Sequence, residues 1–237
     1  MKKRPVVTVV GVAVLTLIAL AALAVSSNPY SFSQNRRTVT ANHALSFIQP
    51  ANHDAKLKTI AGNLSVYPFG VYFCCFGNTI AAGPPNFPFQ AWVAIPFTPT
   101  ADANVTRLEA SVGTFGGSDA GAFQIQLLAD NNNSPGKPIK TFTVSTEPTY
   151  GSCCTLDVGK DKAGIPVKKG TQYWIAVTTS SKQTAFAGGW AFNSTDMRGG
   201  EIAGWCEGSS TYCGSNSGVW VVGKSGDPLP AYAILGN

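Results

Sequence analysis

The six cysteines are the residues of this sequence whose type and spacing point most directly to a chemistry. Cys206 and Cys213 enclose the short polar segment "EGSSTY", and the other four form two adjacent pairs, in "YFCCFG" and "GSCCTL". An even number of cysteines in a chain that leaves the cytoplasm is typical of disulfides. We therefore expect three disulfides. Cys206 should bond to Cys213, because the polar segment between them is short enough to return on itself.

The two doublets, Cys74-Cys75 and Cys153-Cys154, leave three arrangements open. We favour bridges between the doublets, which would close a loop of about 80 residues and contribute on the order of 4 kcal/mol in the chain-entropy model. A ring within each doublet would be strained, because consecutive Cα atoms lie only about 3.8 Å apart. A four-cysteine zinc site is the third arrangement, but adjacent thiolates converge poorly on one ion. Within the favoured arrangement either pairing of the four cysteines fits the sequence.

Residues for acid–base or nucleophilic catalysis are scarce. The only histidines, His43 and His53, precede the segment that we expect to fold, so a Ser-His-Asp or Cys-His centre is not predicted. A glycosidase would instead need two converging carboxyl groups, for which Glu201 and Glu207 are the candidates. Surface carboxylates are the favoured interpretation of both, so we expect a non-catalytic protein, with a secreted carbohydrate-active enzyme as the alternative.

Aromatic side chains beside amides are the best candidates for ligand binding. Such a pairing grips sugar rings by stacking and hydrogen bonding. The candidates are Trp190 with Asn193, and Trp205 with Tyr212, next to the Cys206–Cys213 loop. Packing in the core is the favoured interpretation of each of these rings, and ligand binding is the alternative. The other tryptophans, Trp92, Trp174 and Trp220, lie among apolar strand residues and are expected in the core.

The segment "DNNNSPGKP" is rich in oxygen-bearing side chains. Asp130 and Asn132 could contribute to a calcium site, because Ca²⁺ takes six to eight oxygen ligands. Asx residues before Pro-Gly are also what a hairpin turn requires, and we favour the turn. No cofactor is predicted beyond this weak structural calcium site.

Residues 1–25 have the pattern of an export segment. Lys2, Lys3 and Arg4 precede an uncharged stretch from Pro5 to Val25, and Ala22-Leu23-Ala24 supplies a small-x-small cleavage signal. The stretch is also just long enough to form a helix that spans a bilayer. We expect either a cleaved signal peptide or a retained N-terminal anchor, and both place the remainder outside the membrane. Residues 26–55 are polar and are expected to form a poorly ordered tether.

The net charge of +5 arises mostly outside the domain expected over residues 56–237. From residue 56 onward the chain has 12 Lys and Arg against 11 Asp and Glu, a balance of +1. Basic patches with interleaved aromatics are lacking there, so nucleic acid is not an expected partner. Membrane contact is expected only through the N-terminal segment.

Residues 56–237 are predicted to form one all-β domain. Short apolar or alternating runs are predicted strands at 90–99, 105–113, 122–130, 139–145, 171–179, 185–193, 218–223 and 231–236. The 25 glycines and 15 prolines favour tight turns between them. Single-face alternation without helical or βαβ patterns predicts an antiparallel β-sandwich, with a jelly roll as the expected topology.

Three segments resemble the bacterial extracellular β-sandwich domains called choice-of-anchor domains. These are "QLLADNNNSPGKPI" (126–139), "GTQYWIAV" (170–177) and "GGWAFNST" (188–195), and "GSCCTL" fits the same pattern. The resemblance covers residues 89–236 and implies a fold rather than a chemistry, since the family brings no established catalytic residues. Members typically carry a C-terminal anchoring tail. This sequence ends in "AILGN" without an apolar tail, so the N-terminal segment is the expected anchor.

Together these observations predict a secreted or cell-surface domain that attaches to a surface or matrix. An extracellular glycan or a surface protein is the expected partner. A purely structural envelope protein is a further alternative.

Overall fold

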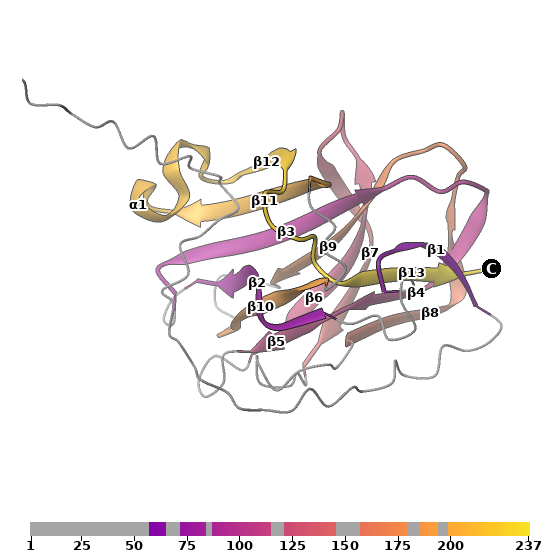
Figure 1. Cartoon of the computed structure of the whole chain (residues 1–237), viewed down its shortest axis with the longest axis horizontal. Helices are drawn as coiled ribbons and strands as arrows, with labels where there is room; N and C mark the ends of the chain where they lie inside the picture. Colours follow the sequence, from indigo (N-terminus) through magenta and orange to yellow (C-terminus); the bar gives the residue numbers. More distant parts are fainter. Residues whose placement is uncertain are drawn as a thin grey trace, which may run out of the picture.

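The computed structural model describes residues 57–64, 72–83, 87–114, 121–145, 157–179, 185–193 and 199–237, and they form an antiparallel all-β, sandwich-like domain (Figure 1). The predicted export segment and tether lie outside these residues. None of the helices within the described ranges is long and apolar enough to cross a bilayer. The strands are β1 (Lys58–Gly62), β2 (Tyr72–Ala82), β3 (Phe89–Phe97), β4 (Ala103–Ala110), β5 (Val112–Thr114), β6 (Phe123–Asp130), β7 (Pro135–Val144), β8 (Asp157–Val167), β9 (Tyr173–Thr179), β10 (Ala187–Asn193), β11 (Glu201–Gly208), β12 (Val219–Lys224) and β13 (Tyr232–Gly236).

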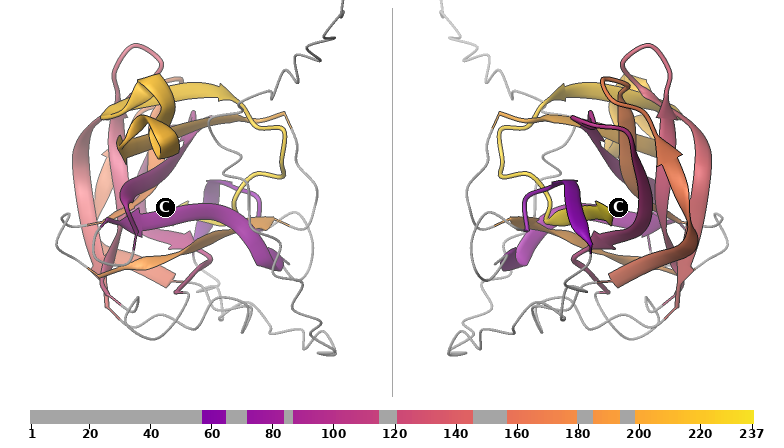
Figure 2. Two further views of the ribbon diagram at one scale, coloured as in Figure 1. Left: turned by 90° about the vertical axis from the view of Figure 1, so that its left-hand side faces the viewer. Right: turned by 90° about the vertical axis from the view of Figure 1, so that its right-hand side faces the viewer.

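The strands form two sheets. The smaller sheet has the order β1-β13-β4-β8, and the larger follows β5-β10-β2-β3-β9-β6-β7, with β11 and β12 added beside β3. The larger sheet is strongly curved, and Figure 2 shows its strands wrapping around the domain as a half-barrel. Sheet twist and the alternation of side chains let both sheets direct apolar residues into one interior.

Strand β3 branches the larger sheet. One of its edges pairs first with β2, at Gln90 and Ala91, and then with β9, from Val93 to Phe97. Its opposite edge pairs with β11 from Phe89 to Ala94. The first half of β3 therefore carries β11, and through it β12, as a three-stranded ribbon.

The two sheets are joined at Ser111. Strand β4 of the smaller sheet continues through this residue into β5 of the larger one. The backbone of Ser111 donates to Ala231 and accepts from Ala191, so the crossing point is tied to segments of both sheets. Strands that change sheets in this way form the corners of curved β-sandwiches.

The main core lies between the two sheets and contains the residues that alternation placed inside. Leu108, Ala110 and Val112 face it from β4 and β5. Phe123, Ile125 and Leu127 face it from β6 and are fully buried. Burial of such aliphatic and aromatic side chains stabilises a domain by about 1.5–3 kcal/mol each.

All eight predicted strands are present, with bounds shifted by a few residues. Four further strands, β1, β2, β8 and β11, were not predicted, and neither was the single turn of helix α1 (Ser210–Cys213). Cys74 and Cys75 are residues of strand β2. Cys153 and Cys154 lie outside the described residues, so bridging between the doublets stays a prediction.

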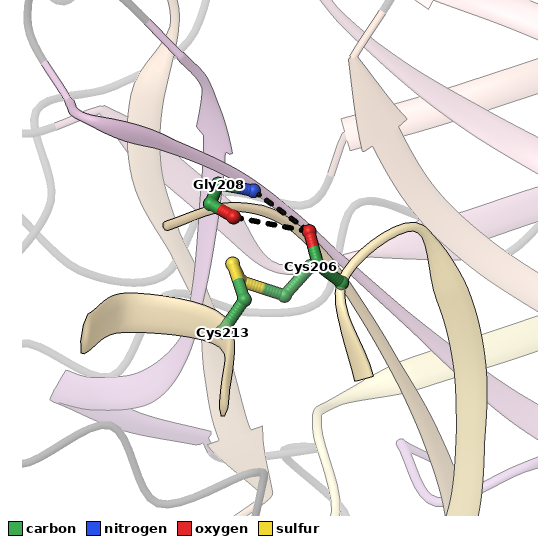
Figure 3. Close-up of a disulfide and its surroundings, with 4 residues drawn as sticks. Cys206, Gly208 and Cys213 are labelled. Atoms are coloured by element: carbon green, nitrogen blue, oxygen red, sulfur yellow. Dashed lines mark hydrogen bonds between the residues drawn. A yellow bond between two sulfur atoms is a disulfide. The ribbon is translucent and has the colours of Figure 1, made fainter. Parts of the chain in front are cut away.

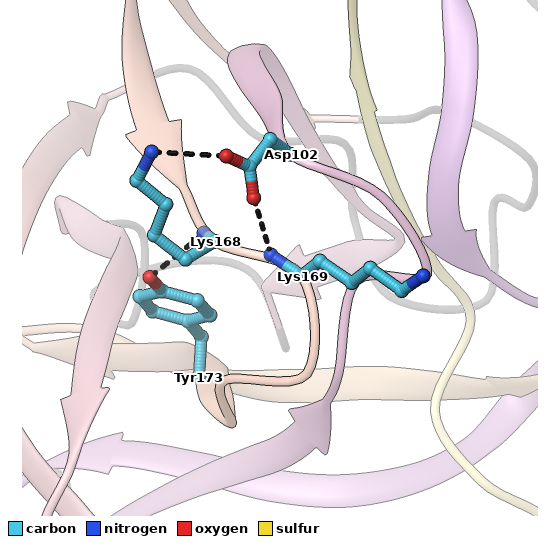
Figure 4. A network of polar contacts seen from close by, with 4 residues as sticks. All are labelled: Asp102, Lys168, Lys169 and Tyr173. Carbon is cyan, nitrogen blue, oxygen red and sulfur yellow. Dashed lines mark hydrogen bonds and ion pairs between the residues drawn. The ribbon is translucent and has the colours of Figure 1, made fainter.

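The connection between β8 and β9 is fixed by the residue that precedes β4. The carboxylate of Asp102 accepts hydrogen bonds from Lys168 Nζ at 2.9 Å and from the backbone N–H of Lys169 at 2.8 Å (Figure 4). The backbone N–H of Lys168 donates in turn to the hydroxyl of Tyr173. These contacts connect the two sheets at one end of the domain. Because these polar groups bond to one another, their arrangement does not require a ligand.

Candidate ligand-binding site

Three tryptophans form a row across the ribbon of β3, β11 and β12. Trp205 lies directly opposite Trp92 on one side and Trp220 on the other. The rings of Trp92 and Trp205 are stacked, with centroids 3.9 Å apart, and Trp220 lies 6.3 Å from Trp92. All three side chains are half-buried. We call this group the tryptophan row.

The row lies on the face of the larger sheet that points away from the main core. In β11, Ile202 belongs to the main core, whereas Ala203 belongs to a separate cluster on the opposite face. Side chains alternate along a strand, so Trp205 shares the face of Ala203. This second cluster also contains Ala94, Leu128, Trp174, Ala176, Trp220 and Val222. The three small alanines are fully buried there, which leaves room for large rings to cover them.

Polar residues border the row on the same face. Gln90 and Glu207 lie opposite each other on β3 and β11, two residues beyond Trp92 and Trp205. In the other direction, Glu201 lies opposite Lys224 on β11 and β12. Partly exposed rings flanked by carboxylate groups can stack on a sugar while hydrogen-bonding its hydroxyls.

Two polar contacts fix the row on its β9 side. The indole N–H of Trp92 donates to the hydroxyl of Thr179 at 2.8 Å, and Gln90 Nε2 donates to the same oxygen at 2.9 Å. Gln90 and Thr179 are buried. The orientation of Trp92 is therefore set by the protein itself.

The disulfide between Cys206 and Cys213 closes the ribbon next to the row, as the sequence predicts (Figure 3). It holds helix α1 against β11, while the hydroxyl of Ser217 both donates to the carbonyl of Gly208 and accepts from its N–H. The chain thereby returns to begin β12 beside β11. In β12, Trp220 then lies opposite Trp205.

Tyr212 lies on the opposite side of the ribbon from the row. Its ring is 44% exposed and stacks on Phe89, with centroids 5.3 Å apart. Phe89 shares a cluster with the half-buried cysteines of the disulfide. The sequence suggested that Tyr212 and Trp205 belong to one candidate site. In the structure they lie on opposite faces of the ribbon.

Of the two interpretations that the sequence left for Trp190, the structure shows packing in the core. Trp190 is fully buried in the main core, and its indole N–H donates to the carbonyl of Ala231 at 2.9 Å. Asn193 is also fully buried, and its side-chain amide donates to the carbonyl of Asn63. Both residues hold strands together, and neither is open to a ligand.

The Asx-rich segment forms the hairpin between β6 and β7. Asn132 and Asn133 have positive φ angles of 54° and 60°, as the turn requires. Asp130 accepts hydrogen bonds from the indole of Trp174, the backbone of Asn133 and the side chain of Gln172. Desolvation raises the pKa of the Asp130 carboxyl, but these three donors outweigh it and hold the pKa below its usual value. The oxygens of Asp130 that the calcium interpretation would use already serve the fold.

Glu201 and Glu207 do not form a pair of catalytic carboxyls. Both lie on the unbroken strand β11. Six residues of strand separate them by about 20 Å, whereas glycosidase carboxyls lie about 5–10 Å apart. They stand instead at the two ends of the tryptophan row.

Within the described residues, no group of three or more His, Cys, Asp or Glu side chains is arranged to hold a metal ion. No family model, curated protein or solved structure matches this chain.

Proposed function

We propose that this protein is an exported, non-catalytic domain that attaches to a surface by binding a polysaccharide through the tryptophan row. The observation that carries the proposal is the alignment of Trp92, Trp205 and Trp220 on three adjacent strands. The rings are partly exposed, with polar residues at both borders, and this suits contact with sugar rings. An apolar core position would explain burial, but not a row on the outer face.

Export from the cytoplasm is part of the same proposal. It is supported by the pattern of residues 1–25 and is compatible with the Cys206–Cys213 disulfide, since such bonds persist in oxidising compartments. Either a signal peptide or an N-terminal anchor would place the domain at or beyond the cell surface. The resemblance to choice-of-anchor domains and the jelly-roll topology belong to this proposal too.

The test is retention of the full, oxidised chain, in mild detergent, on insoluble polysaccharides of different linkage. Cellulose, chitin and an insoluble β-1,3-glucan serve as probes. We expect at least one of them to retain the wild type. A Trp220→Ala variant should bind that probe about fivefold to tenfold more weakly, because one aromatic contact contributes about 1 kcal/mol or more.

Tyr212→Ala is the matched control, because it removes an exposed aromatic ring from the other side of the ribbon. Its retention should equal that of the wild type. Absence of retention on every probe, or equal loss in both variants, would refute binding through the tryptophan row and favour a purely structural envelope role.

A further inference from the structure

Strand β12 is the outermost strand of the ribbon, and half of its backbone groups point away from the protein. Ser225 donates its N–H to Gly200, which continues the register of the β11–β12 pair. Backbone groups alternate in direction along an antiparallel strand, so residues 219, 221 and 223 also face β11. The N–H and C=O groups of Trp220, Val222 and Lys224 therefore point outward. In the described part of the chain, β12 pairs with β11 alone.

This edge lacks the features that usually protect an edge strand from pairing. Prolines and repeated charges perform that task in natural sheets. Strand β7 has Pro135 and Pro138 with two lysines, and β8 has Pro166 with several charged residues. Strand β12, "VWVVGK", has no proline and a single charge at its end. Its Val219 is 53% exposed, more than the other large hydrophobic side chains of the described residues.

We propose that β12 pairs antiparallel with the β12 of a second copy of this chain. The two-fold register that uses all the outward groups places Val222 opposite Val222 of the second copy. Lys224 then lies opposite Trp220 of the other copy, and this contact occurs twice. A lysine over an indole is attractive by about 0.5–1 kcal/mol at an exposed site, and no two lysines meet.

The proposed pairing is self-complementary, and in this register Lys224 does not oppose association. It would continue the ribbon into a six-stranded sheet and bring two tryptophan rows onto one surface. A single strand pair buries little area, so we infer a weak dimer whose population depends on protein concentration. The pairing does not depend on the ligand of the row.

The test is sedimentation velocity of the full chain in mild detergent over a rising concentration series. We expect a monomer–dimer equilibrium in the wild type. Val222→Pro should weaken it at least about tenfold, because proline removes an outward N–H and takes no bond from β11. Val222→Thr keeps the N–H and should associate like the wild type. Retention of the Cys206–Cys213 disulfide and of the thermal transition verifies that each variant is folded.

Lys224→Gln provides a second variant at an exposed position and should weaken association about fivefold or more through loss of two cation–π contacts. Lys137→Gln, on β7, is its control and should have no effect. A wild type that remains monomeric throughout the series overturns the proposal. Dimers that persist unchanged in folded Val222→Pro overturn it as well, because they would require another interface or another partner strand.

Discussion

Trp205 stacks on Trp92 with the two ring planes inclined by only 15° and their centroids 3.9 Å apart. The two residues are 113 positions apart in the sequence and meet because β11 pairs with the first half of β3. This contact places the tryptophan row on the outer face and fastens the ribbon to the larger sheet.

The stacked pair should be energetically coupled. A double-mutant cycle with Trp92→Leu and Trp205→Leu is expected to give a coupling free energy of about 1 kcal/mol, the usual value for aromatic pairs beyond their burial. Denaturant unfolding of the four proteins measures it. A cycle between Trp205 and the distant Ile139 is the control and should give a value near zero. Equal coupling in both cycles would contradict a specific stacking contribution.

Removal of the Cys206–Cys213 disulfide should destabilise the domain and loosen the ribbon. The short loop between the two cysteines predicts a loss of about 2.5 kcal/mol in the Cys206→Ser, Cys213→Ser double variant. Hydrogen exchange should rise first in α1 and at the start of β12. Unchanged exchange in these segments would show that the ribbon is held without the disulfide.

Asn63 should be important for the stability of the domain, although its sequence resembles that of a surface loop. Its side-chain amide donates to the carbonyl of Pro230, and its side-chain oxygen accepts from the N–H of Tyr232. Asn63→Ala would leave buried backbone groups unpaired, at a cost of about 2–4 kcal/mol. Chemical denaturation measures the loss. Asn131→Ala, in the exposed hairpin and without a positive φ angle, is the control and should cost much less.

Alkaline pH should destabilise the domain through Tyr232. Burial raises the pKa of its phenol to about 12, from an ordinary value of 10.0. A raised pKa in the folded state means that the stabilisation is complete below pH 10 and is lost as the pH rises toward 12. The full loss corresponds to about 3 kcal/mol. Stability curves of the wild type and Tyr232→Phe at rising pH should diverge in this window, and parallel curves would contradict the assignment.

Much of the strand pattern was predictable because one face of each predicted strand is apolar. Leu108, Ala110 and Val112 alternate with polar neighbours, and so do Phe123, Ile125 and Leu127. Strand β8 was missed because "DVGKDKAGIPV" has lysines and glycines where a buried face would have aliphatic residues. Strand β11 was missed because Gly204 and Cys206 interrupt its pattern.

The candidate site was predictable only in part, because local sequence does not reveal which face a ring occupies. Gly188 and Gly189 beside Trp190 left open whether its ring is exposed. In the structure a side chain at Gly188 would collide with the backbone of Gly113, so this glycine allows β5 and β10 to approach closely, and Trp190 is buried. Conversely, Trp92 and Trp220 were expected inside, but they cover a second apolar face. Only the pairing of distant strands brings them to Trp205.

Strand β13 occupies the middle of the smaller sheet, between β1 and β4. Its residues 232–236 follow the other described strands along the chain, yet β1, the first described strand, has its described strand pairing with β13 alone. A chain emerging from a ribosome thus cannot close this sheet until residues 232–236 are free. The smaller sheet should therefore assemble only after the rest of its strands have been synthesised.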